Sequence, residues 1–279
     1  TSIGILKDQP PPEVFIDIND VAFLKAHSFY SGSLYVGANT TLTDAIALFK
    51  AVSVENPEYF AYTEQLALHI QKVANVPVRN VGTIAGNLSI KHAAREFQSD
   101  IFLILEAAGA LISIRGDNEA IECLTLPDYL ETDMYKKVIL QIILPPLDCN
   151  EYIFKTYKIA PRAQNALAYV NAGFRFKVNK NDKYRVVELP RLVFGGINPF
   201  FIHAENTERY LVGRRLLDMS TLQTALNILG KEIKPDYRLP DSSPEYRRGL
   251  SLALFYRVIL SVSPSSVRIR YRSGGEDIT

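Results

Sequence analysis

Gly82, Thr83, Gly86 and Asn87 form the segment whose residue types and spacing could best support chemistry. Glycine lets the backbone come close to another group because it carries no side chain. The segment offers backbone N–H donors, and Thr83 and Asn87 add a hydroxyl and an amide, neither of which is a titratable base. We therefore expect contact with a bound cofactor rather than a catalytic nucleophile. The alternative is structural, with both glycines and Asn87 shaping a strand end and a tight turn.

The motif at residues 83–87, Thr-Ile-Ala-Gly-Asn, resembles the Thr-x-x-Gly-Asn segment of the flavin domain in molybdenum hydroxylases, the xanthine dehydrogenase and aldehyde oxidase family. A second stretch, residues 157–173, resembles the other lobe of that domain, and the aldehyde oxidase branch in particular. The resemblance therefore extends over both halves of the chain. It implies FAD as the cofactor and a two-lobe, PCMH-type flavin fold.

The resemblance also implies which residues contact the flavin. Residues 83–87 match the family segment directly, and Asp100 matches an acid that follows a serine. Lys158 matches a lysine of the second lobe whose charge would favour the reduced flavin, although a lone strand lysine more often extends into water. The implied cofactor-binding set is Val73, Thr83, Ile84, Ala85, Gly86, Asn87, Asp100, Ile139 and Lys158. Within it, Ile139 occupies an apolar contact position, and Val73 a position that is often aromatic in the family. No residue is assigned a catalytic or metal-binding role.

The charge balance and the scarcity of reactive residues exclude several classes of protein. With 31 basic and 30 acidic residues the net charge is +1, so no surplus of cations would attract nucleic acid or an anionic membrane. Cys123 and Cys149 are far apart and the four histidines are scattered, which predicts neither a disulfide framework nor a metal site. No apolar run approaches the ~20 residues that span a bilayer, and the first residues lack a secretion pattern. We therefore expect a cytoplasmic protein.

The chain is predicted to have an α+β fold in two lobes. We place an FAD-binding lobe at residues 1–147, a second flavoprotein lobe at 148–264 and a linker at 265–279. Long strand-like segments at 136–144, 152–159, 168–178 and 184–194, joined by Gly, Pro and Asn turns, predict a small antiparallel sheet with helices packed on it.

Two helices of the first lobe can be predicted from apolar spacing and end signals. The spacing after Pro57 predicts one long helix, which Asn75 and Pro77 are expected to end. A second helix is predicted to begin at Ser99 or Asp100 and to end at Gly109.

The resemblance implies an electron relay in a larger enzyme. Electrons from aldehyde oxidation at a molybdopterin cofactor would pass through [2Fe-2S] clusters to FAD and then to dioxygen. Segments outside this chain would bind the clusters and the molybdenum. The expected partners are therefore the iron–sulfur and molybdenum domains of the same polypeptide, in a homodimeric parent enzyme.

The chain departs from the family pattern at its start. The family's first flavin-binding loop, a strand followed by Gly-Asn-Thr, has no counterpart in residues 1–12. We therefore expect the flavin lobe to be incomplete at its N-terminus. Two alternatives stay open, namely a free-standing FAD dehydrogenase of the same fold and a structural or interaction domain that has lost the cofactor.

Overall fold

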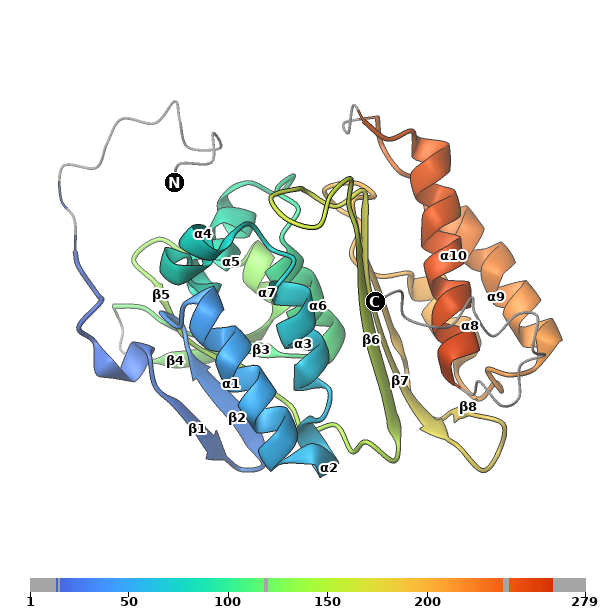
Figure 1. Ribbon diagram of the computed structural model, residues 1–279, viewed down its shortest axis with the longest axis horizontal. Coiled ribbons are helices and arrows are strands. Elements are labelled where there is room, and N and C mark those ends of the chain that lie inside the picture. Colours follow the sequence, from blue (N-terminus) through green and yellow to red (C-terminus); the bar gives the residue numbers. More distant parts are fainter. Residues whose placement is uncertain (1–13, 15, 118–119, 238–240, 263–279) are drawn as a thin grey trace.

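The computed structural model describes residues 14, 16–117, 120–237 and 241–262. Within them the chain forms two antiparallel sheets with their own helices, and the two lobes lie side by side (Figure 1). The predicted α+β fold is confirmed. The linker predicted at 265–279 and the start of the chain, where the first flavin loop was sought, lie outside the described residues.

The sheet of the first lobe has the strand order β1-β2-β5-β3-β4. A short 3-10 turn, Ala22–Leu24, precedes it. Its strands are β1 (His27–Tyr30), β2 (Ser33–Gly37), β3 (Leu111–Arg115), β4 (Ile121–Thr125) and β5 (Val138–Leu144). Every neighbouring pair is antiparallel, and β5 lies between β2 and β3. Because β2 and β5 are far apart in sequence, their pairing brings the chain after residue 37 next to the chain around residue 139.

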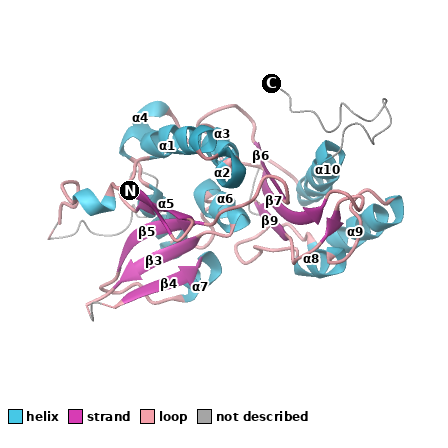
Figure 2. Cartoon of the chain, turned by 90° about the horizontal axis from the view of Figure 1, so that it is seen from below, coloured by secondary structure: helices cyan, strands magenta, loops and turns pink. Residues whose placement is uncertain are grey.

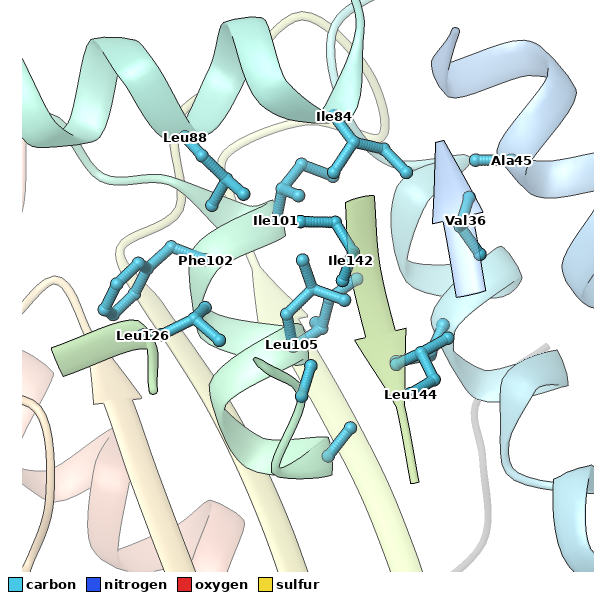
Figure 3. Close-up of a cluster of buried hydrophobic side chains, with 14 of the residues drawn as sticks. Val36, Ala45, Ile84, Leu88, Ile101, Phe102, Leu105, Leu126, Ile142 and Leu144 are labelled. Carbon is cyan, nitrogen blue, oxygen red and sulfur yellow. The ribbon is translucent and has the colours of Figure 1, made fainter. Parts of the chain in front are cut away.

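The helices of the first lobe pack on this sheet and enclose one apolar core. They are α1 (Leu42–Glu55), α2 (Pro57–Phe60), α3 (Thr63–Ile70), α4 (Val76–Val81), α5 (Ile84–Ala93), α6 (Asp100–Ala108) and α7 (Leu126–Glu131). Figure 3 shows Ile84 of α5 and Ile101 of α6 meeting Ile142 of β5 in this core. Every residue of α6 is buried, which is typical of a helix covered on all sides.

The second lobe is a smaller antiparallel sheet with helices on its outer face (Figures 1 and 2). Its strands are β6 (Tyr152–Ile159), β7 (Val170–Asn179), β8 (Arg185–Val186) and β9 (Arg191–Gly195), and its helices are α8 (Glu205–Leu211), α9 (Met219–Glu232) and α10 (Pro244–Val262). Strand β7 is central and pairs with β6, β8 and β9. Helix α6 of the first lobe covers the face of this sheet that α10 does not.

The period-two alternation of a strand explains how β7 serves both lobes. Phe174 points toward α10, where its ring lies 6.2 Å from that of Phe255. Gly173 points toward α6, and a Cβ atom built there would lie only 2.5 Å from the Cβ of Ala107. Glycine is therefore required at this position, because it allows α6 to lie directly on the sheet.

The helix predicted after Pro57 is wrong in its extent. The chain forms α2 and then α3, with Ala61 and Tyr62 between them. Asn75 does not end a helix. Its side chain accepts a hydrogen bond from the Val78 N–H and caps the start of α4, with Pro77 in the first turn. Asparagine and proline favour helix starts for physical reasons as strong as those that place them after helix ends.

The other element predictions fare better. Gly109 ends α6 in the left-handed region at φ 80°, and Ser99 caps its start, so this helix is confirmed. Residues 152–159 form β6 as predicted. The segment 184–194 is instead divided into β8 and β9, because Pro190 between them has no N–H to donate to a neighbouring strand.

Candidate functional site

The glycine segment forms the junction between two helices rather than a strand end. Gly82 follows α4, and Thr83 caps α5 by accepting a hydrogen bond from the Gly86 N–H at 3.0 Å. Gly86 therefore lies in the first turn of α5. The structural alternative of a strand end with a tight turn is wrong. The start of α5 carries the positive end of its helix dipole, which favours a neighbouring negative group.

A cleft of about 450 Å³ lies against this helix start. It is bounded by the chain that follows β2, the first turns of α5, the α7 segment and the beginning of β5. The lining residues are Ile18, Ala38, Asn39, Thr83, Ala85, Gly86, Ser89, His92, Tyr129, Met134, Lys137, Val138 and Ile139. Four of the predicted cofactor-binding residues are among them, namely Thr83, Ala85, Gly86 and Ile139.

The first backbone N–H groups of α5 are already hydrogen-bonded within the protein. The Ile84 N–H donates to the Thr40 carbonyl at 3.1 Å, and the Ala85 N–H donates to the Ala38 carbonyl at 3.1 Å. The Gly86 N–H donates to Thr83. The expectation that this segment offers free backbone donors to a ligand is therefore wrong, because these donors instead hold α5 to the chain after β2.

The cleft retains features that fit a flavin nucleotide. A Cβ atom at Gly86 would meet only the Thr83 hydroxyl, at 3.0 Å, so the missing side chain leaves room on the cleft side rather than relieving a backbone clash. Ile18, Met134 and Ile139 provide apolar surface for a planar ring system. The Lys137 ammonium lies 3.3 Å from Glu122 Oε1 and has further N–H donors, and the Asn39 amide makes only long contacts of 3.4–3.5 Å with Asn19 and the Ile18 carbonyl. This mixture of apolar surface and polar side chains fits FAD.

Three other predicted residues do not line this cleft. Ile84 is 1% exposed and Val73 is 9% exposed, and both belong to the apolar core of the first lobe (Ile84 in Figure 3). The side chain of Asn87 accepts a hydrogen bond from the Ser99 hydroxyl, which joins α5 to the start of α6. These three predicted residues therefore lie outside the lining of the cleft.

Asp100 and Lys158 come together in a buried ion pair between the lobes. The Lys158 Nζ lies 2.9 Å from the Asp100 Oδ2 and also donates to the Lys72 carbonyl at 3.0 Å. The Lys158 side chain is 3% exposed and that of Asp100 is 8% exposed. The Asn171 amide of β7 donates to the other carboxylate oxygen at 2.5 Å. Two predicted residues that are 58 positions apart in sequence are thus brought into contact.

The buried surroundings determine the charge states in this pair. Burial alone would raise the pKa of the Asp100 carboxyl, but the His69 ring and the Lys158 ammonium outweigh that effect and hold the pKa below its ordinary value. His69 lies 3.7 Å from Asp100, and its own burial lowers its pKa. We therefore assign a carboxylate to Asp100 and a neutral imidazole to His69 at neutral pH.

A second cavity, of about 370 Å³, lies between the lobes beside the start of α6. Ser99 and Asn171 line it, together with Gly195 and Gly196 at the end of β9. Asn171 therefore touches both this cavity and the Asp100–Lys158 pair. Phe194, Gly195 and Gly196 lie together in the wall of this cavity.

The resemblance did not indicate several residues of the cleft. Asn39 and Lys137 are two of its polar residues, and His92 lies in it with a ring nitrogen 2.8 Å from the Thr132 carbonyl. A signal existed in the polar run Asn39-Thr40-Thr41 shortly after β2. This run reaches the cleft only because β2 pairs with β5, and the Ala38 N–H donates to the Leu140 carbonyl of β5. A local pattern could not predict that pairing.

The described residues hold neither a metal-binding cluster nor a membrane-spanning helix. They contain no group of three or more His, Cys, Asp or Glu side chains placed to hold a metal ion. None of the described helices is both long enough and apolar enough to cross a membrane.

A cleft at a helix start in the first lobe, joined to a smaller helix-covered sheet in the second, gives two lobes, and each of them matches a family model. The family model described as "FAD binding domain in molybdopterin dehydrogenase" matches residues 1–147, and the model described as "CO dehydrogenase flavoprotein C-terminal domain" matches residues 155–262. The chain belongs to this family of molybdenum hydroxylase flavin domains. The predicted family and FAD as its cofactor are confirmed.

The relatives agree with this assignment. An indole-3-acetaldehyde oxidase of Arabidopsis thaliana is 31% identical over 93% of this chain and 20% of its own length. An abscisic-aldehyde oxidase of the same plant is 29% identical over 96% of the chain and 20% of its own length. The chain therefore spans about a fifth of the length of these curated relatives.

Solved structures share the fold. Carbon monoxide dehydrogenase from Hydrogenophaga pseudoflava has a TM-score of 0.72 at 17% identity, covering 90% of this chain and 82% of that chain. Quinoline 2-oxidoreductase from Pseudomonas putida 86 has a TM-score of 0.69 at 23% identity, with the same coverage of both chains. The arrangement of the two lobes is thus a fold that these enzymes share.

Proposed function

We propose that this chain binds FAD in the cleft of its first lobe and relays electrons within an aldehyde-oxidising molybdoflavoenzyme. The observation that carries the proposal is the convergence of Thr83, Ala85, Gly86 and Ile139 on one cleft at the start of α5. When bound, FAD supplies reversible redox chemistry, which needs no reactive side chain from the protein. This agrees with the absence of any catalytic assignment in the sequence.

The protein's own residues would bind and orient the cofactor. Asn39 and Lys137 would donate hydrogen bonds to its polar groups, and Ile139 would pack against its rings. Asn87 would hold α5 in place through Ser99. The Asp100–Lys158 pair and Val73 would lie on the side of the site that faces the second lobe. Because the pair is buried, its charges would be held in fixed positions and little exposed to water.

The wider setting is also a proposal. The relatives' names support an aldehyde as the substrate of the parent enzyme. We propose dioxygen as the final electron acceptor, partners in the iron–sulfur and molybdenum domains of the same polypeptide, a homodimeric parent and a cytoplasmic location. Residues 1–147 and 148–264 would act as the flavin lobe and its supporting lobe.

A second candidate is a domain that keeps this fold without the cofactor. The observation that favours it is the internal use of the Ile84, Ala85 and Gly86 N–H groups, which removes backbone donors that could hold phosphate.

Replacing Gly86 by valine distinguishes the two candidates. The branched side chain would enter the cleft and press on the Thr83 cap, so we expect the affinity for FAD to fall at least about tenfold and the purified native protein to lose most of its FAD. FAD is measured from the flavin absorbance of the released cofactor.

The matched control is Gly249→Val. Gly249 has open space around its Cβ position and lies on α10, away from the cleft. Normal FAD content in the Gly86→Val variant, with circular dichroism like that of the control, would remove the cleft as the flavin site.

A further inference from the structure

A second buried cluster of charges lies between the lobes, at the opposite end of α6 from Asp100. Glu106 of α6 is 1% exposed at its side chain and meets His203 and Arg191 of the second lobe. The Nε2 of His203 lies 2.7 Å from the Glu106 Oε1, and its Nδ1 lies 2.6 Å from the Oε1 of Glu208 on α8. The imidazole is therefore held between two carboxylates from different lobes.

The hydrogen-bond geometry determines the protonation of this ring. The Glu208 Oε1 also accepts the Leu192 N–H at 2.6 Å, and the Glu106 Oε1 also faces the Arg191 guanidinium. Both oxygens are thus acceptors, so both ring nitrogens of His203 must donate. A neutral imidazole has only one N–H, and only the imidazolium can satisfy both contacts.

The charged groups in direct contact with the ring balance when the ring is protonated. Two carboxylates face it, and one guanidinium, that of Arg191, shares Glu106 with it. A further cation, Arg175 of β7, donates to the Ala108 carbonyl at 2.9 Å, close to Arg191 at the end of α6. Loss of the His203 proton would leave a buried carboxylate facing a lone pair.

We infer that the His203 imidazolium is an interlobe latch that holds the C-terminal end of α6 on the sheet of the second lobe and opens when the ring loses its proton. The latch would affect the rest of the molecule only through the placement of α6, because His203 contacts Glu106 and Glu208 and touches neither the lining of the flavin cleft nor the Asp100–Lys158 pair. Its consequence for α6 is specific. The N-terminal end of the helix keeps its own ion pair with Lys158, whereas the end at Glu106 and Ala108 loses its contact with His203 and is then held by Arg191 and Arg175.

The direction of the pH dependence follows from the ring's surroundings. Burial by itself lowers the pKa of His203, but Glu106 and Glu208 outweigh this and raise the pKa to about 9, from 6.5. A pKa that is raised on folding gives stability that is fully present below about pH 6.5 and is lost as the pH rises through about 9. A shift of that size corresponds to a rise in the unfolding equilibrium constant on the order of 100-fold over this window.

Two measurements test the latch in the full chain without depending on FAD. Nitrogen-15 NMR of the histidine rings at pH 7.5 should show both nitrogens of one histidine protonated, with that signal absent in His203→Gln. Hydrogen exchange across residues 104–110 at pH 7 should be at least tenfold faster in His203→Gln than in the wild type. The matched control is His27→Gln, an exposed histidine on β1, which should change neither readout.

A second variant keeps the test independent of the folding of His203→Gln. Glu208→Gln leaves one carboxylate at the ring, so the doubly protonated signal should disappear at a lower pH than in the wild type. An ordinary titration of His203 near pH 6.5 in the wild type would overturn the inference, as would unchanged exchange at the end of α6 in folded His203→Gln. Neither measurement involves flavin, so a negative result for the proposed FAD site would not contradict the inference about His203.

Discussion

Replacing Lys158 by methionine is expected to lower the free energy of unfolding by about 3–5 kcal/mol, the range found when one partner of a buried ion pair is removed. The change would leave the Asp100 carboxylate, 8% exposed at its side chain, without its cation. The neutral His69 nearby cannot replace that charge, and only the Asn171 amide would still donate to Asp100. Urea unfolding followed by circular dichroism measures the loss.

Two further variants separate the ion pair from a general effect of losing a lysine. Lys50→Met on the exposed face of α1 should change stability by no more than about 0.5 kcal/mol. The double variant Asp100→Asn with Lys158→Met should recover much of the loss, because no charge is then left buried. A single Lys158 variant as stable as the Lys50 variant would show that the pair contributes little.

Replacing Arg247 by methionine is expected to cost a similar amount, about 3–5 kcal/mol, for a different reason. The Arg247 side chain is fully buried on α10 and donates to the carbonyl oxygens of Gly196 and Asp236. The Asp236 carboxylate lies 3.7 Å away. Methionine fills part of the volume but leaves these buried acceptors without donors. Because Gly196 and Asp236 line the interlobe cavity, its wall should loosen as well.

The neighbouring Arg248→Met is the control for this position. Arg248 is on the same helix but exposed, so its loss should change the unfolding midpoint in urea little. Equal midpoints for the two variants would mean that the carbonyl groups find water or other donors when Arg247 is removed.

Local signals in the sequence predicted much of the fold. Gly109 marks the end of α6 because it adopts a left-handed conformation at φ 80°, which glycine favours. Residues 152–159 form β6 because they are rich in β-branched and aromatic residues. Asn75 was misread because an asparagine shortly before a proline suits a helix start as well as a helix end. The residues after Pro77 decide between the two, and they continue as α4.

The candidate site was predictable in the segment 83–87 and, through the family resemblance, at Ile139. Thr83 and Gly86 stand in a pattern that points to a cofactor, and both line the cleft. Asn39 and Lys137 could not be found in this way, because their place in the cleft depends on the pairing of β2 with β5. The occupied N–H groups of α5 were also hidden, since their acceptors belong to the chain after β2. Contacts between residues far apart in the chain cannot be predicted from the sequence around either residue.

Photolabelling of the native protein with an azido derivative of FAD tests most directly whether the first-lobe cleft holds the flavin. We expect the label, after proteolysis and mass spectrometry, on peptides that contain residues 37–41, 83–93 or 129–139, and we expect excess FAD to prevent it. Labelling confined to residues 193–202, which contribute to the interlobe cavity, or labelling that excess FAD does not reduce, would contradict the assignment of this cleft.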